Sequence, residues 1–287
     1  MSATVYFSRT ITPESLLELY GKLGKTLPGK VAVKLHSGEK GNQNFLGPEF
    51  WKPLIDHVGG TVVECNTAYK GERHTTERHI RLMADHGWSK HFNVDILDAC
   101  GPDLELPIPD GKQIQKNFVG KDMENYDSML VLSHFKGHPM GGFGGAIKQL
   151  SIGVASSYGK KYIHGVGHTE DFWNADHDAF LEAMADAAKS VIDYFHGNLL
   201  YVNVMKNMSV DCDCCAVAED PCIADIGILV SDDPIAIDQA CVDLVKASTD
   251  KGRDHLLERI NSRNGEHTLE AATALGYGQR EYTLIEV

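Results

Sequence analysis

Apolar residues recur along this chain with two alternating periods, and the succession of these periods predicts its secondary structure. Short runs rich in Val, Ile and Leu predict strands at 31–36, 61–65, 93–97, 128–133, 199–204, 226–231 and 282–287. Apolar residues at helical spacing predict helices that open at Thr12-Pro13 and cover 48–58, 75–86, 176–195 and 234–247, with two more before the last strand. This alternation is typical of crossover units on a mostly parallel or mixed sheet flanked by helices, so the expected fold class is α/β.

A polar stretch interrupts this alternation near the middle of the chain. Residues 101–111 are rich in Pro, Gly and Asp, and residues 113–119 look extended, which predicts the start of a hairpin. The length of 287 residues is enough for one domain or for two lobes. We expect a single α/β domain over residues 1–287, with a lobe boundary near 101–125 as the alternative.

Composition and charge narrow the class of protein. Hydrophobic residues make up 43% and charged residues 23%, which is typical of a soluble globular protein, and no apolar run is long enough to span a bilayer. The first residues lack the pattern of a signal peptide, so we expect a cytoplasmic protein with reduced thiols. The net charge of -13 argues against a nucleic acid or a membrane surface as partner. A small-molecule substrate or a redox protein is expected instead, and a homo-oligomer is left open.

Four of the seven cysteines fall within the twelve residues 211–222, namely Cys212, Cys214, Cys215 and Cys222. Cys212 and Cys214 can face one way in extended backbone, with Cys222 arriving from across the loop and Cys215 as a further ligand. The neighbouring carboxylates raise thiol pKa values unless a cation is present, so we expect a bound cation to hold this loop in shape. The ligands favour an iron–sulfur cluster or a single zinc, iron or nickel ion. The alternative is a set of free thiols in a buried loop.

A glycine-rich segment follows the most apolar predicted strand and carries His134, Lys136, His138 and Lys148. Ligands of open α/β sheets bind outside the carboxyl ends of strands, so these side chains are expected at a site. Four glycines are expected to let backbone amides approach a cofactor or substrate: Gly141, Gly142, Gly144 and Gly145. The alternative is that the glycines only permit tight packing.

Two further segments are expected to join this site. Lys34 and His36 lie on one face at the end of the first predicted strand, and His164 and His168 surround another glycine turn. We expect Lys34, His36 and His164 to bind a cofactor and His168 to carry protons. Residues 73–79 are most simply an exposed helix start with Thr75 or Thr76 as its cap.

Several segments together resemble the uncharacterised family known as domain of unknown function 362. They are Val33–His36, Ser133–His138, Gly144–Leu150, Asp211–Cys215 and Asp225–Asp238. The resemblance implies a cytoplasmic prokaryotic α/β protein associated with iron–sulfur chemistry, although this chain has no ferredoxin cysteine run. The segment Lys148–Gly153 shows a looser likeness to the nickel-pincer lactate racemase family, in which histidines and a lysine also surround a glycine-rich turn.

The leading hypothesis is a metal-dependent enzyme, an oxidoreductase or isomerase, acting on a small anionic or carbonyl substrate. The cysteines would hold the metal, and Lys136 or Lys148 would polarise a substrate oxygen. His134, His138 or His168 would move protons. The alternative is a non-enzymatic metal-binding or electron-transfer protein.

Overall fold

One mixed sheet runs through the protein, which is described here by a computed structural model covering residues 2–287. In spatial order its strands are β12 (Tyr282–Glu286), β1 (Ala3–Ser8), β11 (Gly227–Ser231), β10 (Leu199–Met205), β7 (Ser128–His134), β2 (Val31–Lys34), β3 (Thr61–Glu64) and β4 (Val94–Ile96). β11 is antiparallel to both of its neighbours, and the other adjacent strands are parallel. The expected α/β class with a mostly parallel sheet is confirmed.

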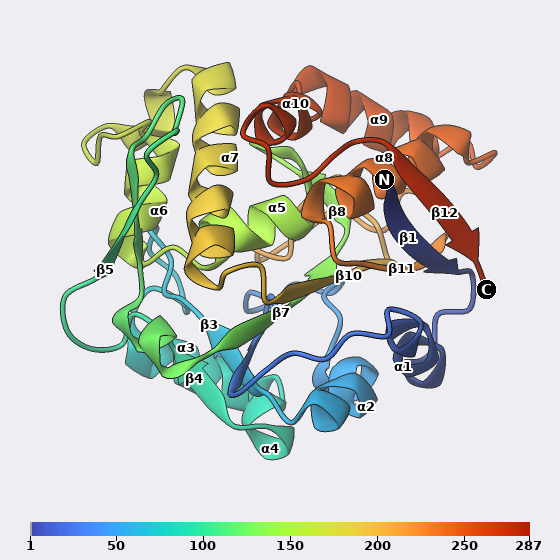
Figure 1. Ribbon diagram of the computed structural model, residues 1–287, viewed down its shortest axis with the longest axis horizontal. Helices are drawn as coiled ribbons and strands as arrows, with labels where there is room; N and C mark the ends of the chain where they lie inside the picture. The colour runs from blue at the N-terminus through green and yellow to red at the C-terminus, as the bar shows by residue number, and fades with distance from the viewer. Residues whose placement is uncertain (1) are drawn as a thin grey trace.

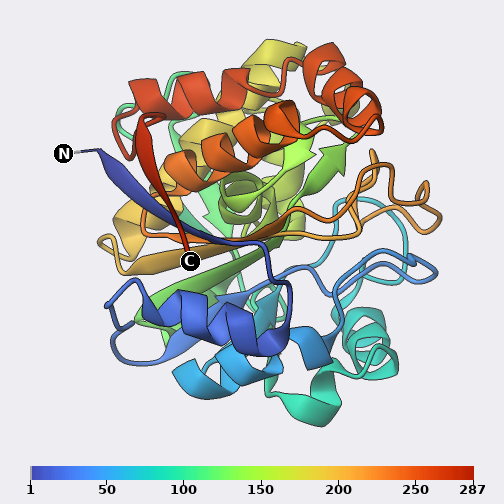
Figure 2. The same cartoon turned by 90° about the vertical axis from the view of Figure 1, so that its right-hand side faces the viewer.

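Helices cover both faces of this sheet (Figures 1 and 2). On one side lie α1 (Pro13–Gly21), α2 (Pro48–Val58), α3 (Thr76–Asp85) and α4 (Trp88–His91). On the other lie α5 (Ala146–Lys148), α6 (Ser157–His164), α7 (His177–Tyr194), α8 (Pro234–Ala247), α9 (Arg253–Ser262) and α10 (His267–Ala274). Short 3₁₀ and π turns occupy Lys121–Asn125, Gln149–Gly153 and Phe172–Asn174.

The central strand β7 explains why the sheet is buried on both faces. All seven of its residues are buried, and successive side chains point to opposite faces. Met129 and Val131 join the core beneath α7 and α8, whereas Leu130 and Leu132 join the core beneath α1 and α2. A strand covered by helices on both sides reads as a continuous apolar run, which is why the sequence predicted it clearly.

The predicted strands and long helices are confirmed to within a few residues at their ends. The hairpin in the middle of the chain is also confirmed, because β5 (Leu104–Pro107) pairs antiparallel with β6 (Lys116–Val119). The strand β1 and the helices α4 and α6 were not predicted. The glycine-rich segment is not a simple loop, since β8 (Lys136–His138) and β9 (Gly142–Gly144) form a small hairpin there.

Parallel strands bring their carboxyl ends to one edge of the sheet. The segments that leave β2, β3 and β7 meet there with residues 206–226, which leave β10, and these connections lie on the right in Figure 2. The glycine-rich segment and the cysteine-rich segment therefore become neighbours although they are far apart in sequence.

The start of α5, which carries Lys148, is fixed by the buried carboxylate of Asp238 on α8. Its oxygens accept hydrogen bonds from the backbone N–H groups of Ala146 at 2.7 Å and Ile147 at 3.0 Å. The Asn203 side-chain amide donates a third at 2.7 Å. Burial raises the pKa of Asp238 to about 6, against the effect of these three donors.

We predict that Gly145→Ala lowers the free energy of unfolding by about 2 kcal/mol, because overpacking a closely fitted interior costs that order of energy. A Cβ at residue 145 would lie 2.2 Å from Asp238 Oδ1, whereas a Cβ at residue 144 meets no atom within 4 Å. Urea unfolding should therefore show the loss for Gly145→Ala and little change for the control Gly144→Ala. Equal stabilities for the two variants would contradict this account of the α5 start.

Candidate active site at the ends of the parallel strands

A cavity of about 170 Å³ lies at this edge of the sheet. Its wall combines residues from β2, from the segments after β3 and β8, from α5, from α6 and from the cysteine-rich segment. Six of the residues singled out in the sequence line it: Lys34, His36, His138, Lys148, His164 and Cys214. The fold thus brings into one place residues from four separate stretches of the chain.

Cys212, Cys214 and His138 form a group, called the donor group, whose possible metal-ligand atoms all lie within 4.8 Å of one another. Lys148 Nζ lies 3.9 Å from Cys212 Sγ, and the backbone N–H of Cys214 donates to the same sulfur at 3.3 Å. A hydrogen bond with the Cys214 side chain lowers the pKa of Cys212 well below its usual value, against burial, and Lys148 and His138 add to this effect. These contacts favour the thiolate form of Cys212, whereas the same hydrogen bond raises the pKa of Cys214 well above its usual value.

Backbone hydrogen bonds fix the ring of His138. Its Nδ1 accepts from the N–H groups of Met140 at 3.2 Å and Gly141 at 2.9 Å. In the neutral ring the proton therefore sits on Nε2, and burial lowers the pKa of His138 so that the neutral form is favoured. Binding a metal through Nε2 would release that proton.

The structure does not bring Cys215 and Cys222 into this group. The Cys215 thiol contacts Cys214 and is half-buried, while Cys222 Sγ faces the carbonyl of Met208 at 3.5 Å. A four-thiolate set for an iron–sulfur cluster is therefore not assembled within residues 2–287. Two thiolates and an imidazole are compatible with a single zinc, iron or nickel ion.

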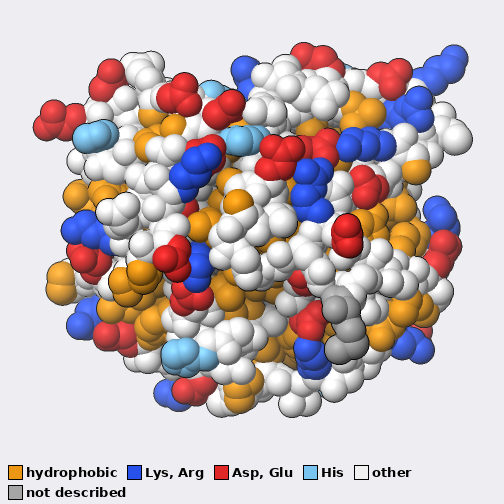
Figure 3. Space-filling model, turned by 45° about the horizontal axis from the view of Figure 1, so that its top comes forward, with side chains coloured by type: hydrophobic (Ala, Val, Ile, Leu, Met, Phe, Trp, Pro, Cys, Tyr) orange, Lys and Arg blue, Asp and Glu red, His pale blue; other side chains and the backbone are white. Residues whose placement is uncertain are grey.

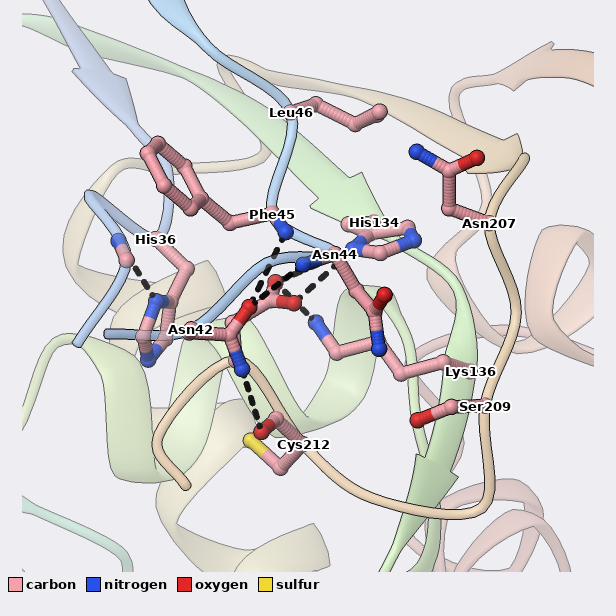
Figure 4. A network of polar contacts seen from close by, with 12 residues as sticks. His36, Asn42, Asn44, Phe45, Leu46, His134, Lys136, Asn207, Ser209 and Cys212 are labelled. Atoms are coloured by element: carbon pink, nitrogen blue, oxygen red, sulfur yellow. Dashed lines mark hydrogen bonds and ion pairs between the residues drawn. The ribbon is translucent and has the colours of Figure 1, made fainter. Parts of the chain in front are cut away.

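Hydrogen bonds from the segment after β2 hold the cysteine-rich segment in place (Figure 4). The side-chain amides of three consecutive residues, Asn42, Gln43 and Asn44, donate to the carbonyl groups of Cys215, Ala218 and Glu219 at 2.9, 2.7 and 2.8 Å. Polar contacts within the protein therefore contribute to the shape of this loop, and the expectation that a bound cation also holds it stays a prediction.

Asp213, which lies between Cys212 and Cys214 in the cysteine-rich segment, contacts two of the residues expected to be catalytic, His134 and Lys136. Its buried carboxylate lies 3.0 Å from His134 Nδ1 and 2.6 Å from Lys136 Nζ. His134 Nε2 also lies 2.5 Å from the carbonyl oxygen of Lys206. Burial alone would raise the pKa of Asp213, but His134 and Lys136 hold it well below its usual value. Neither of these two residues lines the cavity, and we assign both to a structural ion pair.

Five further residues that were expected at the site, four glycines and His168, do not line the cavity. The four glycines of the glycine-rich segment do not line the cavity, and Gly145 instead gives Asp238 room to cap α5. His168 is exposed and lies outside the cavity wall, because the chain turns back at Gly165 and Gly167 after α6 ends. Their expected roles in binding and proton transfer stay predictions.

Lys34 and His36 reach the cavity wall, but each has a partner there. Lys34 Nζ lies 2.7 Å from a carboxylate oxygen of Glu64, and both side chains are almost fully buried. Arg73 lies 3.1 Å from His36 Nε2 and also pairs with Glu39 at 3.1 Å. Burial lowers the pKa of His36 well below its usual value, and the positive charge of Arg73 lowers it further.

Arg73 and Glu64 line the cavity and were not predicted. The interpretation of residues 73–79 as an exposed helix start is wrong for its two ends, since Arg73 is 4% and His79 is 0% exposed. Thr75 does precede the first residue of α3, although its side chain makes no capping hydrogen bond. Glu64 ends its strand as Lys34 ends β2, so the same strand-end signal would have found it.

α6 presents His164 and the unpredicted Lys160 to the cavity from one face, four residues apart. The His164 ring stacks on Phe180 with centroids 4.6 Å apart, and its buried Nδ1 has no hydrogen-bond partner within residues 2–287. Burial lowers the pKa of His164 to about 3, so its ring is neutral. Lys160 is 7% exposed, and burial lowers its pKa as well.

The chain belongs to the family described as domain of unknown function (DUF362), whose model matches residues 31–243. No curated protein sequence matches it. No helix within residues 2–287 combines the length and the apolar character that crossing a bilayer requires.

Among solved structures, the lactate racemase apoprotein from Thermoanaerobacterium thermosaccharolyticum is similar at 16% identity, with a TM-score of 0.43 over 69% of this chain and 50% of that one. A structural-genomics protein from Thermotoga maritima is similar at 11% identity, with a TM-score of 0.42 over 91% of this chain and 58% of that one. The chain thus spans half the length of the first protein and 58% of the second.

We predict that Asp213→Asn lowers the free energy of unfolding by about 3 kcal/mol, because it removes the buried anion that Lys136 and His134 share. The loop of residues 206–226 should then open to limited proteolysis, whereas the exposed control Asp220→Asn should behave as the wild type.

The pH dependence of this contribution has a definite sign. The folded-state pKa of Asp213 is depressed, so the stabilisation is complete above its unfolded pKa of about 4 and is lost only as the pH falls towards the lower folded value. The stability difference between wild type and Asp213→Asn should therefore show no decline attributable to Asp213 between pH 5 and pH 7. A loop as resistant to proteolysis in Asp213→Asn as in the control would refute the assignment.

Proposed function

We propose that the protein is a metal-dependent enzyme that moves a proton or electrons at a small anionic or carbonyl substrate bound in the cavity. One observation carries this proposal: two members of the donor group, His138 and Cys214, line the same cavity as Lys148 and His164. Ligands for a metal, a cation for a substrate oxygen and an unpartnered basic nitrogen therefore border one enclosed space.

The donor group fits a soft or borderline metal ion. Cys212 and Cys214 offer sulfur ligands and His138 offers an imidazole, and three protein ligands leave coordination positions open. When bound, such an ion would supply Lewis-acid or redox chemistry. The thiolate form of Cys212 is already favoured by its neighbours, so little energy is needed to prepare this ligand.

Lys148 is the residue we assign to binding a substrate oxygen. The negative charge of Cys212 raises the pKa of Lys148 against the effect of burial, so its side chain stays cationic. A fixed ammonium group in a poorly hydrated space stabilises negative charge that develops on a substrate oxygen.

His164 is the residue we assign to proton transfer. It is neutral and its Nδ1 is free of protein partners within residues 2–287, so it can accept a proton from a substrate. A bound anion would raise its pKa towards the neutral range, since an opposite charge nearby favours the imidazolium form. Proton transfer would then be coupled to occupancy of the cavity.

The resemblance to the nickel-pincer family suggests an organic nickel group as a second form of the cofactor. The residues present fit such a group in kind, because Lys148 and the unpartnered His164 nitrogen line the same cavity. Lys148 and His164 would then hold it, and it would supply redox chemistry at the substrate carbon. The two forms differ in which side chains the metal requires.

We predict that protein purified without oxygen contains about one zinc, iron or nickel ion per chain, measured by elemental analysis and protein concentration. Cys212→Ser and Cys214→Ser should each lose most of this metal, because a hydroxyl is a poor ligand for these ions. The matched control Cys222→Ser should retain it, since Cys222 lies outside the donor group.

Other outcomes are equally informative. Nickel that survives both cysteine substitutions but is lost in His164→Ala would indicate the organic nickel group. Protein without metal, or with equal loss in Cys222→Ser, would remove the metal-dependent mechanism.

A further inference from the structure

Lys160 is a buried cation without a buried anion to balance it. Its Nζ donates to the backbone carbonyl of Ala155, and no carboxylate within residues 2–287 lies at ion-pair distance. The carboxylate with the largest charge effect on Lys160 is that of Asp98, whose oxygens accept from the backbone N–H groups of Asn66 at 2.8 Å and Ser157 at 2.9 Å. A buried cation in such surroundings favours an anion that enters from outside.

The other cations at the cavity wall differ from Lys160 in this respect. Lys34 pairs with Glu64, and Arg73 pairs with Glu39. Lys148 faces the Cys212 sulfur at 3.9 Å. Each of these three positive charges already has a negative group of the protein beside it. Lys160 is therefore the cation of the cavity wall that has no negative group of the protein at ion-pair distance within residues 2–287.

Away from these charges the wall is mostly apolar. Most of this part is formed by Ala68, Pro139, Met140, Ile152 and Trp173, and the uncharged polar residues Thr67, Tyr69 and Gln149 also line it. The Trp173 ring is 4.9 Å from the His164 ring and remains 47% exposed, so it borders both the cavity and the solvent. A ligand body packed here would exclude water from apolar side chains without replacing any hydrogen bond of the wall.

The size of the cavity limits that body. A volume of about 170 Å³ is close to that of apolar protein cavities, about 150 Å³, that hold one benzene ring. A sugar acid carries more hydroxyl groups than Thr67, Tyr69 and Gln149 can pair, so some would lie against apolar side chains without partners, which is costly.

We infer that the cavity binds a monocarboxylate with an apolar, ring-sized body, its carboxylate on Lys160 and its body against Trp173, Met140 and Ile152. The inference rests on the proposed function for the place of the substrate, and it adds the chemical class. It requires no metal, since Lys160 is outside the donor group.

Benzoate is a suitable probe, with benzamide as its neutral match, acetate as the carboxylate without a ring and gluconate as the polar acid. Trp173 provides the signal, because the other two tryptophans, Trp51 and Trp88, are buried in the core on the opposite side of the sheet. The full-length protein is titrated by tryptophan fluorescence and by calorimetry, as purified and again after treatment with a chelator.

We predict that benzoate binds at least tenfold more tightly than benzamide, acetate or gluconate, in both preparations. Lys160→Met should weaken benzoate binding tenfold or more and leave benzamide unchanged, because only the charged ligand uses the ammonium group. The neighbouring Lys161→Met, which does not line the cavity, should match the wild type. Lys160→Gln replaces Lys160→Met if circular dichroism shows that the methionine variant does not fold.

Three results would overturn the inference: equal affinity for benzoate and benzamide, unchanged benzoate binding without Lys160, or binding that disappears with the metal. Gluconate or acetate binding as well as benzoate would refute the apolar part. A protein without metal that still binds benzoate through Lys160 would sink the proposed function alone, so the two failures are distinguishable.

Discussion

The buried contact of Asp213 with His134 and Lys136 is the interaction on which the candidate site depends. It joins the cysteine-rich segment to the end of β7 and to β8, and the backbone carbonyl of Asp213 also accepts from the Glu39 N–H at 2.9 Å. A buried carboxylate is stable only while its partners stay close. The contact with His134 and Lys136 therefore fixes the position of the cysteine-rich segment relative to the sheet. Cys212 and Cys214 flank Asp213, so their positions beside His138 follow from it.

Most of the fold could be predicted from the sequence because helices cover the sheet on both faces. The resulting apolar runs, above all in β7, are strong signals. β1 was missed because a single six-residue strand at the start of a chain carries no flanking pattern. α6 was missed because the glycine and histidines near its end suggested a turn. The sequence signal for its start is Ser156, whose side chain caps the helix by accepting from the Gly159 N–H.

The residue types of the site could be predicted from the sequence, but the contacts that each side chain makes could not. His134, Lys136, His138 and Lys148 carry the same signal in sequence, yet two of them face the cavity and two face Asp213. That choice depends on which loop covers the end of β7, and the contacts that decide it join residues 77 and 79 positions apart, which no local pattern encodes. The burial of Arg73 is hidden for the same reason, because its partners come from other elements.

Electrostatic interactions link Cys212 to the cations of the cavity wall. The protein as a whole carries a net charge of -13, and on the face drawn in Figure 3 acidic and basic side chains are interspersed without an extended basic patch. An anion is therefore not drawn in by the surface, and its selection falls to short-range contacts inside the cavity. There, Glu64 and Glu39 neutralise two cations and the Cys212 thiolate neutralises Lys148, provided that no metal takes up its charge. A metal on Cys212 would take up the negative charge that keeps the buried Lys148 protonated, so metal binding and the charge of Lys148 are coupled through this one contact.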